Sequence, residues 1–203
     1  MKKLLKRIGI CLVLAASVWC GSLLADRQRL NDELIRFHVV ANSDSEEDQS
    51  IKLQVRDAVL NSLQNDLNKI ADVNEARAYL QAKLPQIQAV ANSVLEATGC
   101  DCEAVVTLCK EAFDTRYYDT FTLPAGIYEA LRITIGEAAG KNWWCVVFPP
   151  LCTTAACDFQ ETAVSGGLGE EDLSLITEED GGYVLRFRAV ELWEGLRQWL
   201  GKH

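Results

Sequence analysis

Residues 1–25 constrain this chain most strongly, because they join a basic cluster to a long apolar run. Residues 8–25 contain no charged side chain, and four basic residues precede them, at Lys2, Lys3, Lys6 and Arg7. A basic segment followed by an apolar stretch is typical of a secretion signal. As a helix, the run would be about 27 Å long, close to the thickness of the hydrocarbon core of a bilayer. We therefore interpret residues 1–25 as a signal peptide or a membrane anchor.

The distribution of charge predicts the orientation of this segment. Positive charge before an apolar span favours a cytoplasmic N-terminus, so the rest of the chain is expected to cross the membrane. The sequence leaves cleavage open, and residues 8–25 stay in contact with the membrane if the segment is not removed. A lipid-modified Cys20 fits less well, because the bulky Trp19 precedes it. A buried core helix is disfavoured, because nothing amphipathic interrupts the run.

The remainder of the chain is acidic and rich in apolar residues. All 29 Asp and Glu residues follow residue 25, together with 16 of the 20 Lys and Arg residues, which leaves a net charge of −13. This balance argues against nucleic-acid binding, which depends on clustered Lys and Arg. The hydrophobic fraction of 49% supports a real core, and the length fits one exported domain over residues 30–200.

Six of the eight cysteines lie in this expected domain, where an exported location permits disulfides. Cys145 and Cys152 are the pair that we consider first. A full disulfide set and free buried thiols both remain open for the other four, Cys100, Cys102, Cys109 and Cys157. A zinc site is disfavoured, because a single residue separates the first two of these rather than two to four.

The first half of the domain predicts one strand followed by two helices. Residues 34–40 alternate and end in β-branched residues, which favours a strand. A helix is expected to begin after Ser43 or Ser45 as N-cap and to run to about residue 68. A second helix covers residues 74–98, with a break or kink near Leu84 because Pro85 follows it.

The second half predicts consecutive strands. These are expected over residues 103–110, 127–135, 143–148 and 183–187, with an acidic, glycine-rich loop over 165–182 before the last strand. Residues 189–200 form an amphipathic helix pattern. The order predicts an α+β domain with a mainly antiparallel sheet, two helices after the first strand and a C-terminal helix, all behind the N-terminal signal or anchor helix.

No catalytic or metal-binding pattern stands out. The two histidines are His38, in the first expected strand, and the terminal His203, and no nucleophile elbow, phosphate loop or zinc-protease motif accompanies them. The acidic stretch 42–48 resembles a calcium loop in its alternation. However, Glu47 stands where such a loop needs Gly, so a helix cap is the better interpretation. We predict no enzyme activity, no cofactor and no metal.

The stretch from residue 142 to residue 152 is unusually rich in Trp, Pro and Cys. A buried strand with a rigid exit explains most of its apolar residues. Paired tryptophans beside a Pro-Pro turn also fit a recognition surface, since aromatic anchors dominate interfaces. The residues that we predict to bind a partner are Trp143, Trp144, Phe148, Pro149 and Pro150.

Several of these segments resemble one known family, that of stage II sporulation protein R. The matching stretches are residues 35–45, 48–49, 55–59, 123–133, 136–140, 142–145 and 148–152. The first of them ends in Ala41-Asn42-Ser43-Asp44-Ser45, and the last two contain Asn-Trp-Trp-Cys and Phe-Pro-Pro-Leu-Cys. The resemblance singles out motif residues whose role is unknown, namely Asn42, Ser43, Asp44 and Asp48. It covers residues 30–155 well and the C-terminal part loosely.

The resemblance implies a signalling protein rather than an enzyme. Members of such a family are made in the forespore and exported into the space between forespore and mother cell, where they would remain soluble or anchored in the facing membrane. There they activate a membrane-embedded aspartic protease, which processes the precursor of a mother-cell sigma factor. Two alternatives from other classes stay open. One is an exported envelope hydrolase of thiol or carboxylate type, and the other is a membrane-tethered structural protein of the envelope.

Overall fold

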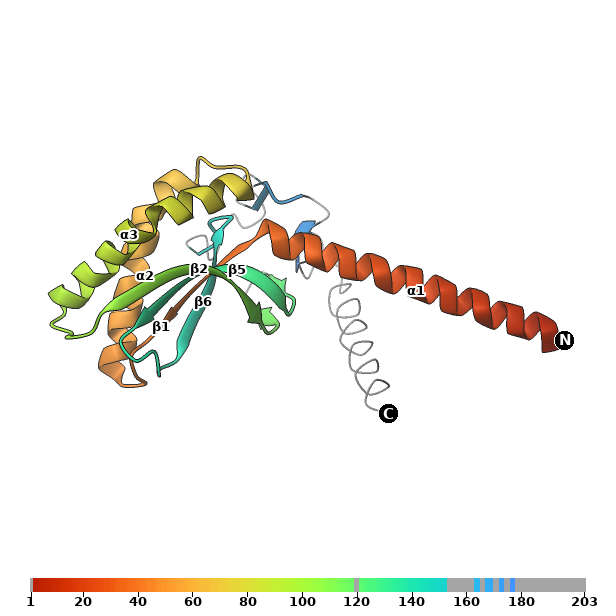
Figure 1. Ribbon diagram of the computed structural model, residues 1–203, viewed down its shortest axis with the longest axis horizontal. Coiled ribbons are helices and arrows are strands. Elements are labelled where there is room, and N and C mark those ends of the chain that lie inside the picture. Colours follow the sequence, from red (N-terminus) through yellow and green to blue (C-terminus); the bar gives the residue numbers. More distant parts are fainter. Residues whose placement is uncertain are drawn as a thin grey trace.

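The computed structural model describes most of the chain through residue 152 and a few short pieces beyond it. The described residues are 2–118, 121–152, 163–164, 167–169, 172–173 and 176–177. The expected strand 183–187 and helix 189–200 lie outside these ranges, as does much of the expected loop 165–182. Within the described part, one sheet is flanked by two long helices and joined to a third helix that projects from the body (Figure 1).

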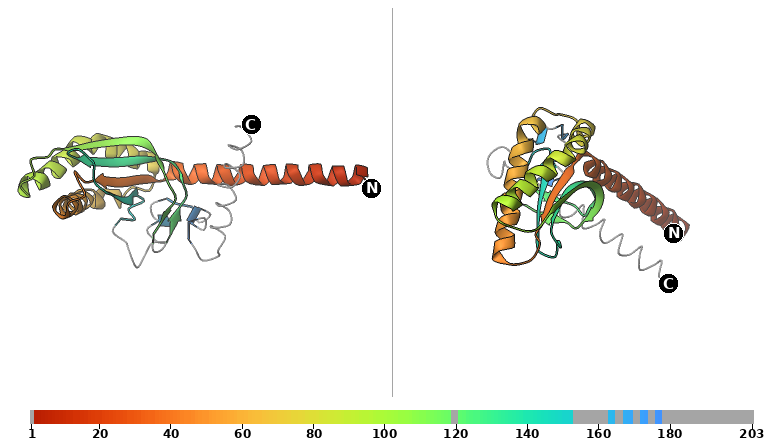
Figure 2. Two further views of the ribbon diagram at one scale, coloured as in Figure 1. Left: turned by 90° about the horizontal axis from the view of Figure 1, so that it is seen from below. Right: turned by 60° about the vertical axis from the view of Figure 1, so that its left-hand side comes forward.

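The projecting helix is α1, which runs from Lys2 to Glu33. Figures 1 and 2 show its N-terminal part extending away from the folded body. Large apolar side chains are exposed along this part, at Leu4, Ile8, Ile10, Leu14, Val18 and Trp19. Its last turns enter the body, where Leu30 and Asn31 are buried. Among the described residues, a search for a helix both long and apolar enough to cross a membrane found none.

The main sheet has four strands in the order β2-β5-β1-β6. Their bounds are β1 Ile35–Val40, β2 Ala104–Phe113, β5 Gly126–Ile135 and β6 Asn142–Phe148. β2 pairs with β5 and β6 pairs with β1 in the antiparallel sense, whereas β1 and β5 are parallel. The sheet is therefore mixed: two of its three pairings are antiparallel, in line with the predicted mainly antiparallel sheet, and the pairing of β1 with β5 differs by being parallel. The difference arises because β5 folds back from β2 and inserts beside β1, a pairing of non-consecutive strands that local patterns do not record.

Two helices cover one face of this sheet. α2 spans Glu46–Leu67 and α3 spans Val73–Ala97, and Figure 1 shows both on the same side of the strands. Ser45 and Asp72 are the N-caps, and their side chains accept backbone hydrogen bonds from the first turns. The two helices after the first strand thus agree with the sequence prediction. Between helices and sheet lies the larger core, whose strand residues include Phe37, Val39, Leu131 and Ile133.

The helix α3 continues through Pro85 without the predicted break. Proline removes one N–H, so the carbonyl of Gln81 loses its usual partner four residues on. Both Pro85 and Gln81 are exposed, so water can satisfy that carbonyl. Ile87 and Leu80, on the buried side, hold the helix against the sheet on both sides of the proline.

The other face of the sheet is only partly covered. At one end, Leu30 and Leu34 from the α1 end pack with Phe113, Tyr128 and Val146 in a second core. A small hairpin, β3 Arg116–Tyr117 and β4 Thr122–Leu123, lies beside it. Toward the other end, Val105, Thr107 and Thr134 keep contact with solvent. We call this second side the open face.

We expect Pro85→Ala to raise the free energy of unfolding by about 1–2 kcal/mol. Restoring the hydrogen bond in a helix interior is worth about 3 kcal/mol, and the more flexible unfolded chain offsets about 1 kcal/mol of it. Urea unfolding measures the change. The control is Gln86→Ala at the exposed neighbouring position, which should stay within about 0.5 kcal/mol of the parent. A destabilised Pro85→Ala variant would show that α3 needs the proline.

Candidate functional site

The turn after β1 is organised by side chains of the Asn42-Ser43-Asp44-Ser45 motif. The carboxylate of Asp48, in the first turn of α2, accepts hydrogen bonds from Asn42 Nδ2 at 3.1 Å and from Ser43 Oγ at 2.5 Å. Asp48 N in turn donates to Ser45 Oγ at 3.1 Å. These bonds to its carboxylate, with the Ser43 bond the largest cause, lower the pKa of Asp48. The motif thus caps the start of α2, and this is the helix cap that the sequence predicted for the acidic stretch 42–48.

The same turn also fixes the loop between β5 and β6. Asn42 Oδ1 accepts from Glu137 N at 3.0 Å, and Asp44 Oδ1 accepts from Lys141 N at 2.7 Å. Backbone bonds add Ala139 N to the carbonyl of Asn42 and Gly140 N to that of Ala41. Two motif segments that are almost a hundred residues apart therefore meet in space. We call this contact between residues 41–48 and 136–141 the motif junction.

Two glycines permit this close approach. Gly136 has a φ of +55°, and a Cβ there would lie 2.3 Å from Asn42 Oδ1. A Cβ on Gly140 would lie 2.2 Å from the carbonyl oxygen of Ser43. Contacts this short do not occur at real Cβ atoms, so larger residues would push the loop away from the turn.

Lys52 supports the junction from α2. Its Nζ donates to Gln49 Oε1 at 2.5 Å and to the carbonyl of Lys141 at 3.1 Å, while Gln49 Nε2 donates to the carbonyl of Ser43 at 2.9 Å. Burial is the main cause that lowers the pKa of Lys52. A buried ammonium group with these partners ties the start of α2 to both sides of the junction.

The strand β6 continues directly from the junction and sends its two tryptophans to opposite faces of the sheet. Trp143 packs edge-on against Phe37 on the helix side, and the guanidinium of Arg56 lies 4.7 Å from its ring centroid. Trp144 lies on the open face, half-buried like Trp143. The structure therefore does not bring the two predicted anchors together on one surface.

The rest of the predicted partner-binding stretch turns inward. Phe148 and Pro149 are buried, and Pro150 is half-buried. Cys145 and Cys152 are joined in a disulfide, with their Cα atoms 5.6 Å apart, and this is the pair that the sequence put first. The thiols that are free among the described residues include Cys100, Cys102 and Cys109, whereas Cys157 lies outside the described ranges.

On the open face, Trp144 is held between a histidine and an arginine. The His38 ring stacks on it with centroids 4.7 Å apart and planes 4° apart. Arg116 from the hairpin lies 4.8 Å from the Trp144 centroid. Phe113 meets the tryptophan edge-on at 5.2 Å. The ring is thus built into a cluster of basic and aromatic side chains.

This cluster contains a carboxylate that bridges two basic groups. Glu111 Oε2 lies 2.9 Å from His38 Nε2, and Glu111 Oε1 lies 3.1 Å from Arg132 Nη1. Burial lowers the pKa of His38, which the Glu111 charge opposes. The lowered pKa favours the neutral imidazole, whose Nε2 faces the Glu111 carboxylate.

Arg36 completes the cluster beneath these groups. Its side chain has no exposed surface, and its guanidinium lies 4.5 Å from the Phe113 centroid and 5.2 Å from that of Tyr128. The Tyr118 hydroxyl is 2.9 Å from Arg36 Nη2 and accepts its hydrogen bond. Burial lowers the pKa of Arg36, although a guanidinium stays protonated at neutral pH. We call Arg36, His38, Glu111, Phe113, Arg116, Arg132 and Trp144 the basic–aromatic cluster.

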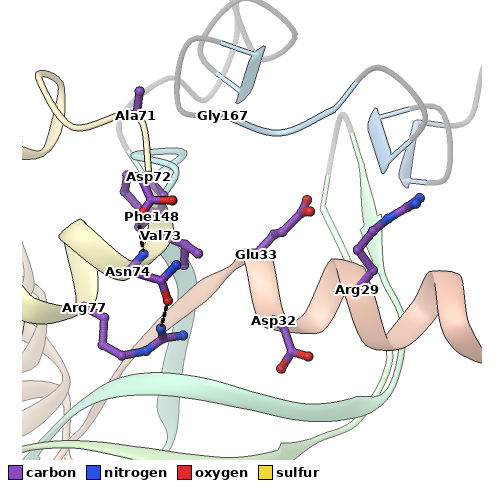
Figure 3. Close-up of a pocket in the computed structure, with 10 residues that line it drawn as sticks. All are labelled: Arg29, Asp32, Glu33, Ala71, Asp72, Val73, Asn74, Arg77, Phe148 and Gly167. Carbon is purple, nitrogen blue, oxygen red and sulfur yellow. Dashed lines mark hydrogen bonds between the residues drawn. The ribbon is translucent and has the colours of Figure 1, made fainter.

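A separate cavity lies where α1 meets the body. Its volume is about 570 Å³, and Figure 3 shows Glu33 and Arg29 on one side with Asn74 and Arg77 on the other. Arg29 Nη2 lies 2.8 Å from Asp172 Oδ1. Burial, with the neighbouring charge of Asp172, raises the pKa of Glu33 to about 7. The cavity is lined by paired charges of both signs, so it favours no single class of ligand.

Metal ligation finds no support in the described ranges. No group of three or more His, Cys, Asp or Glu side chains there is arranged to hold a metal ion. The molecule so described is an α+β domain that follows the N-terminal helix α1, and its motif segments 41–48 and 136–141 meet at one end of the central strand β1.

Comparison with known proteins identifies the family of this chain. The family described as stage II sporulation protein R matches residues 31–158, and the chain belongs to this family. It is 43% identical over 121 residues to the stage II sporulation protein R of Bacillus subtilis (strain 168), which covers 60% of this chain and 54% of that protein. The chain thus matches little more than half the length of this relative. Family membership supports a role in sporulation. No solved structure matches the chain.

Sequence reasoning found the motif residues but missed most of the basic–aromatic cluster. Arg36 and His38 gave a signal, because two basic residues alternate with apolar ones in strand 35–40 and therefore share the face opposite Phe37. Glu111 and Arg132 gave no such signal, because they meet His38 only through the pairing of β1 with β5 and of β5 with β2.

We expect Asp48→Asn to lower the free energy of unfolding at pH 7 by about 1 kcal/mol, because an amide replaces a carboxylate that accepts two side-chain hydrogen bonds. The folded pKa of Asp48 is depressed, so its stabilisation is present above the ordinary Asp range and is lost as the pH falls through the folded pKa. The difference between parent and variant should therefore shrink below about pH 4. Urea unfolding from pH 3 to pH 7 measures it. Asp114→Asn, at an exposed position, is the control. If the free energies of unfolding of parent and Asp48→Asn differ equally at every pH, the Asp48 carboxylate is not the source of the stabilisation.

Gly140→Ala should destabilise the protein by about 1–3 kcal/mol, because the new methyl group overlaps the Ser43 carbonyl. Gly21→Ala is the matched control, since a Cβ at Gly21 meets nothing within 4 Å. Thermal unfolding of both variants measures the difference. Equal midpoints for Gly140→Ala and the parent would show that the loop does not need its contact with the turn.

Proposed function

We propose that this protein is an intercompartmental signal of sporulation, exported from the forespore, which activates a membrane-embedded aspartic protease in the facing membrane. The activated protease would process the precursor of a mother-cell sigma factor. The observation that carries the proposal is family membership over residues 31–158, a range that contains every strand and helix described after α1 from β1 to β6. The protein acts in this account as a ligand and not as a hydrolase.

The form of α1 supports export. Exposed side chains such as Ile8, Leu14 and Val18 are unfavourable in water and stable in an apolar environment. The last turns of the same helix contribute Leu30 to the second core. The folded domain therefore begins where the apolar run ends. Such an arrangement suits a segment that either anchors the domain or directs it across the membrane before removal.

Activation by a bound domain needs no chemistry in the domain itself. A ligand shifts an equilibrium if it binds the active state of its partner more tightly than the inactive state. A rigid domain suits this task, and the disulfide and motif junction make the region around β6 rigid. The surfaces available for such binding include the half-exposed Trp143 and Trp144, one on each side of the sheet.

Substitution of the tryptophans tests the proposal. We expect Trp143→Leu or Trp144→Leu to reduce sigma-precursor processing at least tenfold while most of the folded protein remains. Immunoblots of sporulating cells measure processing, and the soluble domain level measures folding. Leu53→Ala, at an exposed position of α2, is the control and should process normally. If processing and folded protein fall together, the tryptophans act only in packing.

A further inference from the structure

The basic–aromatic cluster carries more positive charge than the described structure compensates. Three arginines, Arg36, Arg116 and Arg132, converge on the open face, and the carboxylate of Glu111 forms an ion pair with Arg132 there. This surplus stands out in a chain whose net charge is −9. Glu111 is already shared between His38 and Arg132.

The guanidinium groups also keep unused hydrogen-bond donors. Within the part of the chain that the structure describes, four buried N–H nitrogens of these residues find no hydrogen-bond partner: Arg36 Nε, Arg36 Nη1, Arg116 Nε and Arg132 Nε. A buried charged group normally has its donors satisfied, because an unpaired one costs free energy. This free-energy cost is largest for Arg36, since its side chain has no exposed surface.

The pairing of strands arranges part of the cluster in one row. His38 lies opposite Arg132 on one side and opposite Trp144 on the other. The Arg132 side chain keeps 40% of its surface exposed, and Arg116 and Trp144 are half-buried. The outer edges of two arginines and a tryptophan are therefore within reach of a molecule outside the protein.

We propose that the open face around Trp144 binds an acidic peptide segment of a partner protein, whose carboxylate groups pair with Arg116 and Arg132. Arginine forms bidentate hydrogen bonds with a carboxylate, and the added negative charge would also compensate the buried Arg36. The inference goes beyond the proposed signalling role, because it rests on the geometry of this face alone.

The surroundings of the arginines favour a peptide over a phosphate or a lipid headgroup. Val105, one row away in β2, is 53% exposed, and Tyr117, next to Arg116, is 70% exposed. An acidic peptide with apolar side chains can use both the charge and these apolar surfaces. A headgroup would use only the charge.

Calorimetric titration of the full chain in detergent micelles tests the proposal. The probe is a capped six-residue peptide of alternating Glu and Leu, and its comparison is the same peptide with Gln in place of Glu. We expect the acidic peptide to bind and the Gln peptide to bind at least tenfold more weakly. Arg116→Gln and Arg132→Gln should each raise the Kd of the acidic peptide about tenfold, the effect of losing one charge-assisted hydrogen bond.

The chain offers a matched control on the other face of the sheet. Arg56 lies over Trp143 at 4.7 Å, as Arg116 lies over Trp144 at 4.8 Å. Arg56→Gln should leave the Kd unchanged, and thermal unfolding checks that all three variants are folded. Arg116 and Arg132 are both partly exposed. If one of these two variants unfolds, the other still tests the proposal.

Three results would overturn the proposal. The first is absence of binding of the acidic peptide to the parent at millimolar concentration, and the second is equal affinity for the Glu and Gln peptides. The third is a Kd that Arg116→Gln and Arg132→Gln leave unchanged. Phosphatidylglycerol vesicles serve as an additional arm, and vesicle binding lost in both variants without peptide binding would assign the face to lipid instead. None of these results bears on precursor processing, which a separate assay measures.

Discussion

The hydrogen bonds of the motif junction are the interaction on which the rest of this domain depends. Asn42 serves both sides at once, since its amide nitrogen donates to Asp48 while its amide oxygen accepts from Glu137. The turn can therefore begin α2 and hold the loop before β6 with the same side chain. Because β6 follows that loop directly, the junction also sets the register of β6 against β1.

The position of β6 then determines what each face of the sheet presents. In the observed register Trp144 lies opposite His38, and Trp143 lies opposite Val39. A shift of one residue would exchange the two tryptophans between the helix side and the open face. The basic–aromatic cluster thus exists because the junction fixes one register. The motif residues and the tryptophans are parts of one structural arrangement, although they lie far apart in the sequence.

Local patterns predicted the elements better than their pairing. The strand at 35–40, the capped helix after Ser45 and the apolar strand at 142–148 follow from side-chain alternation, capping residues and turn residues near them in the chain. The parallel pairing of β1 with β5 could not be predicted this way, because it depends on where β5 inserts after the two helices. Of the break or kink predicted at Pro85, the break is absent for a related reason, since packing of Leu80 and Ile87 outweighed a local preference.

In the candidate site, too, local contacts could be predicted from sequence and contacts between strands could not. The cap residue Ser45 could be identified from sequence, because its side chain accepts a hydrogen bond from the backbone of Asp48, three residues further on. The contacts of Arg132 with Glu111 and of Arg116 with Trp144 join different strands, so only the assembled sheet reveals them. The two tryptophans illustrate the limit most clearly. Adjacent in sequence, they read as one aromatic anchor, yet strand geometry places them on opposite faces.

The central claim is that this domain acts on the far side of a membrane, and the most direct measurement is precursor processing in sporulating cells that make only a chain without residues 1–25. The account predicts no processing from this chain, because the folded domain would stay in the compartment that made it. Restoring an unrelated secretion signal in front of the same domain should restore processing. Full processing by the chain that lacks any signal would contradict the account.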